Sequence, residues 1–204
     1  MINEIITFLA SLITMTIAKV GYFGILILMT LESAGIPIPS EIIMPYGGYL
    51  VFQGKFDFLG VVFMGVFANL LGSLIAYYLA KNGGRELLLK VGKYILLSKR
   101  DLEASERFFG RYGSLTVFAS RMLPVFRTYI SFPAGFARMG VKKFIFYTFF
   151  GSLPWCFLLT YLGLKAGENW LTLRERLKGL EFLAIFLIIG LVVLFIWRHV
   201  GRKK

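Results

Sequence analysis

Two long stretches of this chain carry no charge, and they constrain its fold more than any other feature. Residues 58–80 and 144–164 contain no Asp, Glu, Lys or Arg. At a rise of about 1.5 Å per residue, a helix of either length crosses a hydrocarbon core of roughly 30 Å. Residues 182–198 form a third, shorter run that ends in Arg198, a residue able to snorkel. With 57% hydrophobic residues, the chain is expected to be an all-α polytopic protein with one membrane domain over 1–204.

The basic residues gather beside the membrane runs. The net charge is +12, and segment 81–111 has a clear excess of Lys and Arg over acids. Four more basic residues lie in the C-terminal tail: Arg198, Arg202, Lys203 and Lys204. By the positive-inside rule both regions are cytoplasmic, in a cell (cytoplasmic or inner) membrane, where they attract anionic lipid headgroups. Nucleic-acid binding is disfavoured because these residues flank membrane segments instead of forming one patch.

The N-terminal segment and the rare residue types limit other interpretations. Residues 1–19 are expected to form a helix that either spans the membrane or lies on it. A cleaved signal peptide is a weak alternative, because no basic start and no small-residue cleavage site are present. Cys156 and His199 are the single cysteine and histidine, so no disulfide, metal site or cofactor is expected.

Two further segments carry charges inside apolar sequence. One contains Glu32 and Glu41, and the other contains Arg121 and Arg127. An ionisable group at membrane depth costs at least about 2.5 kcal/mol, so it usually faces a cavity or a partner and marks a substrate or ion pathway. These two segments are therefore the candidate functional site.

Prolines interrupt both segments, and a proline inside a helix removes a hydrogen bond and clashes with the preceding turn. Non-helical backbone survives in a membrane only where protein buries it or water lines it. We therefore expect two re-entrant hairpins, at 23–53 and 113–140. The residues expected to break them are Pro37, Pro39, Pro45, Pro124, Pro133 and Gly135.

The two charged segments also head two similar halves of the chain. A Pro-x-Gly followed by Lys-Phe occurs at 45–56 and, with the same spacing, at 133–144. A Gly-Ser-Leu triplet then occurs in each following membrane run, at 72–74 and at 151–153. The pattern predicts an internal repeat, in which each half is a hairpin followed by a transmembrane helix.

The charge rule places the two hairpins on opposite sides of the membrane. With 81–111 cytoplasmic, the second hairpin enters from the cytoplasm, and the last two membrane runs cross outward and back. Residues 58–80 then run inward, so the first hairpin enters from outside. Interrupted segments in matching positions of two inverted halves indicate the central site of a transporter.

The arginines suit a phosphate headgroup. A guanidinium does not deprotonate in proteins, so Arg121 and Arg127 each need an anion, a carbonyl or water. Guanidinium also matches phosphate as a bidentate donor. The alternative is that both arginines form permanent structural salt bridges with the acids. A mixed case, in which substrate displaces the acids, is compatible with both interpretations.

The acids suit a proton-coupled step. A carboxylate near mid-membrane can take up and release protons near neutral pH, so Glu32 and Glu41 are candidates for proton coupling or for partnering the arginines. For Glu41 the alternative is that it merely stabilises the start of the returning helix, where a carboxylate is favoured. The same alternative is less natural for Glu32, which precedes the break.

At these residues the chain resembles the DedA family, also called the SNARE-associated or VTT-domain proteins. The resemblance covers roughly residues 20–165. It rests on Glu32 with Pro37-Ile-Pro39-Ser40-Glu41, and on Phe118-Ala-Ser-Arg121-Met-Leu-Pro124-Val-Phe-Arg127-Thr128. It implies two inverted halves with facing re-entrant hairpins, lipid transport that depends on protons or membrane potential, and a requirement for these acids and arginines. Where one branch of the family has an aspartate after Pro-Gly, this chain has Pro-Ser-Glu41.

The expected function is therefore a flippase for a phosphate-headgroup lipid, with undecaprenyl phosphate first among substrates. The alternatives are a flippase or scramblase for phosphatidylethanolamine or another phospholipid, and a proton-coupled drug or cation antiporter. A membrane assembly factor or a lipid phosphatase is less favoured. The phosphatase would need a nucleophile or a metal beside the arginines.

Two smaller expectations concern packing. Small residues recur every fourth position at Ala68, Gly72, Ala76 and Ala80, which allows close approach of a helix. That helix belongs either to the same subunit or to a homodimer partner. The tryptophans Trp155, Trp170 and Trp197 are expected to be ordinary membrane and interface aromatics.

Overall fold

The computed structural model describes residues 2–36, 38–95, 113, 115–123 and 126–167, with the backbone alone for 2–9 and 84–95. All of them belong to one compact unit, Met1–Gly167. Several predicted features lie outside the described residues: residues 96–111 of segment 81–111, the helix at 182–198, the C-terminal tail, Pro37, Pro124, Trp170 and Trp197. Within the described ranges the regular structure is helical.

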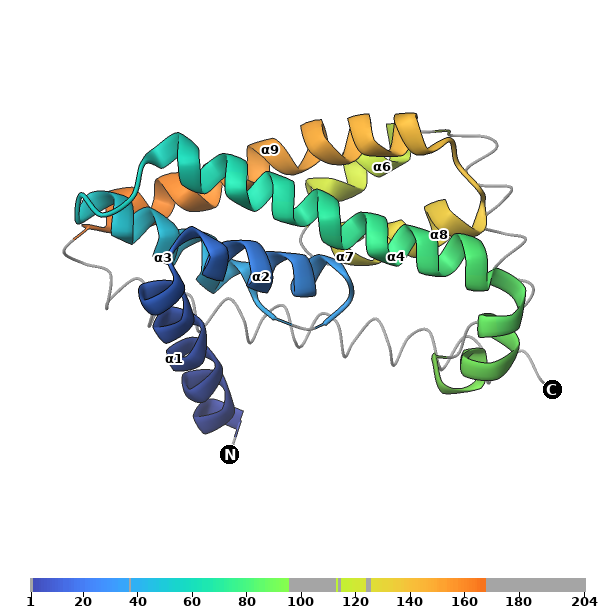
Figure 1. Cartoon of the computed structure of the whole chain (residues 1–204), viewed down its shortest axis with the longest axis horizontal. Coiled ribbons are helices and arrows are strands. Elements are labelled where there is room, and N and C mark those ends of the chain that lie inside the picture. Colours follow the sequence, from blue (N-terminus) through green and yellow to red (C-terminus); the bar gives the residue numbers. More distant parts are fainter. Residues whose placement is uncertain (1, 37, 96–112, 114, 124–125, 168–204) are drawn as a thin grey trace. The chain divides into compact units, whose positions relative to one another are not determined.

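Two long antiparallel helices form the frame of this unit. Helix α4 (Phe58–Ile95) begins after Asp57, whose carboxylate accepts a hydrogen bond from the backbone N–H of Gly60 at 2.8 Å, as a helix N-cap does. Helix α9 (Val141–Ala166) lies beside α4 and runs in the opposite direction (Figure 1). Both are long and apolar enough to cross a membrane, over Phe58–Gly83 and Val141–Ala166. The α4 helix does not end at residue 80, where its apolar run ends, but continues to Ile95.

The first charged segment folds as a helix, a break and a second helix. After α1 (Ile2–Val20), helix α2 (Tyr22–Ser33) ends just beyond Glu32, and α3 (Ser40–Phe52) begins at Ser40. Gly35, with a φ of 111°, lies in the break between them. That angle is in the left-handed region, which glycine adopts at no steric cost.

The second charged segment is more finely divided. Helix α6 (Leu115–Arg121) ends at Arg121, and the chain resumes with two short helices, α7 (Phe126–Tyr129) and α8 (Ser131–Phe136). Figure 1 shows α2 and α6 running in opposite directions, so that the two breaks approach each other from opposite ends of the α4–α9 pair.

Three of the expected break residues lie inside helices, so that part of the prediction was wrong. Pro45 is in the middle of α3, and Pro133 is in the first turn of α8, where its missing N–H has no intrahelical partner in any case. Gly135 is also helical. It is needed for close packing, because a Cβ at this position would lie 2.4 Å from the carbonyl oxygen of Tyr77 on α4. Of the described candidates, Pro39 does lie at a break, as the residue before α3.

The helices of the two segments pack on the frame in a matching way. The first helix of each segment packs on the long helix that follows it, α2 on α4 and α6 on α9, and the returning helices pack on the other long helix, α3 on α9 and α8 on α4. A Cβ on Gly72 would meet Thr30 and Ser33 on α2, and a Cβ on Gly151 would meet Phe118 and Arg121 on α6. Phe118 follows Thr30, and Arg121 follows Ser33, by the same number of residues as Pro133 follows Pro45. The contacts at Gly72 and Gly151 therefore involve matching positions of the predicted repeat.

The small-residue stripe of α4 is used inside the subunit. Ala68, Ala76 and Ala80 are fully buried. The carbonyl of Ala68 accepts a hydrogen bond from the Thr30 hydroxyl of α2, and Ala80 lies close to Gly135 of α8. Between the two alternatives for this face, the structure therefore shows packing within one subunit. A homodimer would need another surface.

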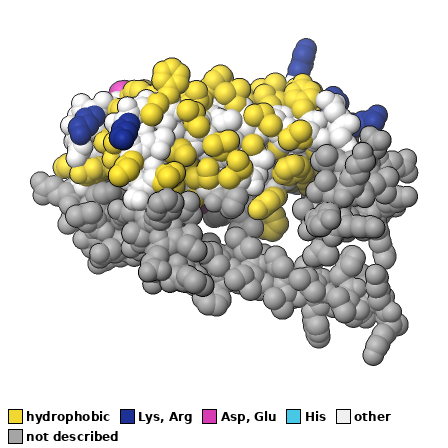
Figure 2. All heavy atoms as spheres, turned by 60° about the horizontal axis from the view of Figure 1, so that its bottom comes forward, with side chains coloured by type: hydrophobic (Ala, Val, Ile, Leu, Met, Phe, Trp, Pro, Cys, Tyr) yellow, Lys and Arg dark blue, Asp and Glu magenta, His cyan; other side chains and the backbone are white. Residues whose placement is uncertain are grey.

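The exterior of the described unit is largely apolar. Large hydrophobic side chains are exposed along α1, α2, α4, α6 and α9, among them Phe63, Phe67, Phe146 and Leu158. Figure 2 shows such side chains over the middle of one face, with Lys and Arg toward its ends. In the most apolar 18-residue window of each candidate span, 44% of α4 and 33% of α9 is buried, so much of each window faces outward, as a lipid environment requires.

Candidate functional site

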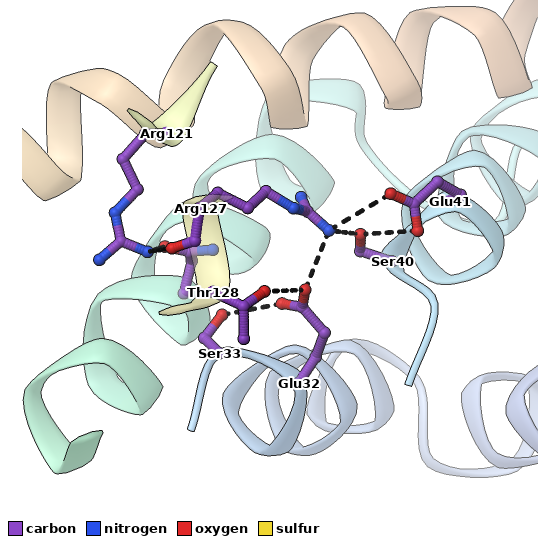
Figure 3. A network of polar contacts seen from close by, with 8 residues as sticks. Glu32, Ser33, Ser40, Glu41, Arg121, Arg127 and Thr128 are labelled. Atoms are coloured by element: carbon purple, nitrogen blue, oxygen red, sulfur yellow. Dashed lines mark hydrogen bonds and ion pairs between the residues drawn. The ribbon is translucent and has the colours of Figure 1, made fainter. Parts of the chain in front are cut away.

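The four charged residues of the two interrupted segments meet where the hairpin breaks face each other. Glu32 is at the end of α2, Glu41 is in the first turn of α3, Arg121 ends α6, and Arg127 is in α7. Figure 3 shows the guanidinium of Arg127 pointing toward both acids, with Arg121 on the opposite side of Arg127. A helix terminus leaves backbone groups without intrahelical partners, so four helix ends converging here create a polar centre.

Arg127 and Glu32 form the centre of the site. The Nη2 atom of Arg127 donates to Oε1 of Glu32 at 2.9 Å, and the two side chains are only 3% and 7% exposed. Oε1 of Glu32 also accepts a hydrogen bond from the Thr128 hydroxyl at 3.0 Å, and Oε2 accepts one from the Ser33 hydroxyl at 3.0 Å. Removing either charge of such a buried pair leaves the other uncompensated, at a cost of about 3–5 kcal/mol.

Glu41 is a weaker and more accessible partner of the same arginine. Its Oε1 lies 3.6 Å from Nη2 of Arg127, and its side chain is 33% exposed. Ser40 lies between them, because its hydroxyl accepts from Nη2 of Arg127 and lies 3.4 Å from Oε2 of Glu41. Glu41 therefore occupies the first turn of α3 and also faces the arginine. Stabilising the start of the returning helix and partnering Arg127 are thus compatible roles for this residue.

Arg121 is held by neutral groups instead of carboxylates. It is 1% exposed, and its Nη1 donates to the backbone carbonyl of Arg127 and to Oδ1 of Asn69 at 3.4 Å. Its Nη2 donates to the hydroxyl of Ser131 at 2.9 Å and of Thr148 at 3.5 Å. These acceptors come from α4, α7, α8 and α9, so Arg121 joins the second hairpin break to both long helices.

The guanidinium of Arg127 is satisfied at one of its three nitrogen atoms only. Its three polar partners all contact Nη2, whereas Nε and Nη1 are buried and have no acceptor among the described residues. The guanidinium lies over the ring of Trp155 of α9, with 5.1 Å from Cζ to the ring centroid. The indole Nε1 of Trp155 is likewise buried with no acceptor in the described part of the chain. Buried donors without acceptors are rare in folded proteins.

The prediction of the site was thus partly complete. The structure brings all four predicted charged residues together, but Arg121 contacts neither acid. Sequence reasoning missed the polar residues that support the charges: Ser33, Ser40, Asn69, Thr128, Ser131 and Thr148. Trp155, expected to be an ordinary membrane or interface aromatic, lies against Arg127. The signal available for Ser33, Ser40 and Thr128 was their adjacency to Glu32, Glu41 and Arg127. Within the described residues, no three His, Cys, Asp or Glu side chains come together as metal ligands would.

Comparison with known proteins gives a consistent result. The family model of the VTT domain matches residues 38–165. Undecaprenyl phosphate transporter A of Bacillus subtilis is 36% identical over 100% of this chain and 96% of its own length. The protein of the same name from Staphylococcus aureus is 32% identical, covering 95% and 97%. A protein of Lactococcus lactis named alkaline phosphatase-like protein is 30% identical, covering 90% and 91%. No solved structure matches the chain.

Proposed function

Because the chain belongs to the VTT-domain family, we propose that it transports undecaprenyl phosphate across the cell membrane, with the phosphate headgroup bound at Arg127. Full-length similarity to two proteins named undecaprenyl phosphate transporter A supports this substrate. The outward-facing apolar surface suits a protein whose substrate keeps its hydrocarbon tail in lipid while the head crosses.

One observation carries the assignment of the headgroup to Arg127. This guanidinium is buried, yet two of its three nitrogen atoms have no acceptor among the described residues. Hydrogen bonds from a guanidinium to phosphate oxygens are charge-assisted and about twice as strong as neutral ones. A phosphate oxygen can therefore accept from Nε or Nη1 of Arg127 while Glu32 keeps Nη2. Both Nη atoms of Arg121 already donate to neutral acceptors, and only its Nε lacks one among the described residues, so Arg121 holds the break in place and adds positive potential.

Charge balance explains why the acids are part of the transport step. Two arginines and two ionised glutamates together carry no net charge, and a bound phosphate adds negative charge to a buried site. Uptake of a proton by a carboxylate offsets one added charge, because an uncompensated buried charge is costly. Glu41 is the more accessible acid and the weaker partner of Arg127, so we assign the proton uptake to it first and give Glu32 the role of constant partner.

The architecture supplies a route for alternating access. We infer that the chain consists of two inverted halves, α2–α4 and α6–α9, because equivalent residues make equivalent contacts at Gly72 and Gly151. The first hairpin would open to the outside and the second to the cytoplasm, with segment 81–111 and the C-terminus cytoplasmic. Membrane potential can contribute, because moving one charge through 100 mV is worth about 2.3 kcal/mol.

The experiment is headgroup translocation in proteoliposomes under an imposed pH gradient, with labelled undecaprenyl phosphate and labelled phosphatidylethanolamine measured in parallel. Wild type is compared with Arg127→Ala and with Lys142→Ala, which removes one exposed positive charge at the start of α9. We expect gradient-dependent movement of undecaprenyl phosphate that Arg127→Ala abolishes and Lys142→Ala retains. Movement of phosphatidylethanolamine alone would assign a different lipid. Movement of neither lipid by folded protein would reject lipid transport.

A further inference from the structure

The aromatic residue beneath Arg127 has no place in the charge network, although its position and its chemistry are unusual. Trp155 lies on α9, four residues after Gly151, whose lack of a side chain lets α6 approach. Its ring packs partly against the core formed by the first hairpin with α4 and α9. An ordinary lipid-facing tryptophan would instead direct its indole N–H toward the membrane interface, where a partner is available.

Two contacts of this residue point to the headgroup. The ring face lies against the guanidinium of Arg127, and such a cation–π contact holds the plane of the cation. The indole Nε1 is buried without an acceptor among the described residues, as are Nε and Nη1 of Arg127. Indole nitrogen is a donor only, so any group that satisfies it must supply a lone pair. Three donors without acceptors therefore belong to two side chains in direct contact.

A phosphate supplies what these donors lack. A monophosphate ester has three strongly accepting oxygens arranged tetrahedrally around phosphorus. One can accept from Arg127 and another from the indole, with no change in the bond between Arg127 and Glu32. Cys156, next in the chain, is buried in the same core, but a thiol sulfur is only a weak acceptor, so it offers no competing acceptor of comparable strength.

We infer that Trp155 is a headgroup-contacting residue: its ring orients Arg127 and its indole N–H donates to an oxygen of the bound phosphate. This inference rests on the proposed function and extends it, because it assigns part of the selectivity for a phosphate monoester to an uncharged side chain. A headgroup whose phosphate oxygens are fewer or blocked, as in the diester phosphatidylethanolamine, makes this contact less well.

The test uses the full-length protein in lipid nanodiscs with Trp170→Phe and Trp197→Phe, which leaves Trp155 as the single tryptophan of the three in the chain. The indole N–H signal of Trp155 is followed by nitrogen-15 NMR during separate additions of undecaprenyl phosphate, of undecaprenol, which lacks the phosphate, of phosphatidic acid and of inorganic phosphate. We expect a saturable downfield shift with undecaprenyl phosphate and none with undecaprenol. A shift with inorganic phosphate alone would show a free-phosphate site and reject the lipid as the ligand of Trp155.

A second measurement separates contact from structural support. Trp155→Phe keeps an aromatic face for Arg127 but has no N–H, whereas Leu158→Ala changes an exposed residue of the same helix. We expect Trp155→Phe to bind undecaprenyl phosphate about tenfold more weakly, equivalent to about 1.4 kcal/mol, at an unchanged unfolding temperature. Leu158→Ala should bind as wild type does.

The outcomes distinguish this inference from the proposed function. Transport and binding of undecaprenyl phosphate with an unshifted indole signal would refute the role of Trp155 and leave the proposed function standing. A shift produced by phosphatidic acid but not by undecaprenyl phosphate would keep the phosphate contact and reject the isoprenoid substrate. Equal affinity of Trp155→Phe and wild type would also overturn the inference.

Discussion

Glu32 and Glu41 should contribute very unequally to the stability of the folded state through their pairing with Arg127. Double-mutant cycles measure the difference. The perturbations are Arg127→Met and Glu32→Gln, alone and combined, and the parallel set with Glu41→Gln. In Arg127→Met, Glu32 keeps the hydroxyls of Thr128 and Ser33 but loses its counter-charge inside the protein.

The magnitudes follow from distance and burial. Oε1 of Glu32 lies 2.9 Å from Nη2 of Arg127, and the Glu32 side chain is 7% exposed. Arg127→Met should therefore lower the free energy of unfolding by about 3–5 kcal/mol, and adding Glu32→Gln should restore about 2 kcal/mol or more of it. Glu41 lies at 3.6 Å with a third of its side chain exposed, which places its coupling to Arg127 within the range of exposed pairs, below about 1 kcal/mol.

The assay is equilibrium unfolding of the full-length protein in mixed micelles, with the coupling energy taken from each cycle. Coupling above about 1.5 kcal/mol for Glu32 and below about 1 kcal/mol for Glu41 is the expected result. Additive effects for Glu32 and Arg127, or a larger coupling for Glu41, would refute the assignment of Glu32 as the constant partner.

Two further predictions concern the frame of the molecule. Gly163→Ala should reduce the amount of folded protein, because its Cβ would lie 1.9 Å from the carbonyl oxygen of Pro45 on α3. A Cβ at Gly140 meets no atom within 4 Å, so Gly140→Ala should accumulate normally. Equal yields of the two variants in the membrane fraction would argue against the close packing of α3 on α9. In a Cys156→Ala background, single cysteines at Gln53 and Gly140 should react with an impermeant maleimide from outside and from the cytoplasm respectively, since the hairpins are proposed to enter from opposite sides. Labelling of both from one side would contradict the inverted arrangement.

The sequence predicted the long helices and the location of the site, because both depend on strong local signals. Uncharged runs of membrane length leave few alternatives to a helix, and a charge inside apolar sequence needs a partner. The same local reasoning failed for Pro45 and Pro133. Each is a proline, the residue type expected to interrupt a helix, but Pro45 lies inside α3 and Pro133 inside α8. The actual interruptions lie between α2 and α3 and between α6 and α7.

The separation of the two arginines could not be predicted because it depends on tertiary contacts. Arg121 and Arg127 have the same side chain and similar neighbours in sequence. Only the fold brings Asn69 and Thr148, from distant helices, to Arg121 while directing Arg127 toward Glu32. The contact of Arg127 with Trp155 of α9 likewise depends on the fold and not on adjacency in sequence.

In the proposed site, the phosphate of undecaprenyl phosphate binds at Arg127. The most direct measurement is the phosphorus–nitrogen dipolar coupling by solid-state NMR, with the full-length protein labelled with nitrogen-15 in its arginine side chains and reconstituted with undecaprenyl phosphate. We predict a coupling to guanidinium nitrogens that disappears in Arg127→Lys and persists in Lys142→Ala. Absence of any coupling in the wild type, or a coupling that survives Arg127→Lys unchanged, would contradict the proposed site.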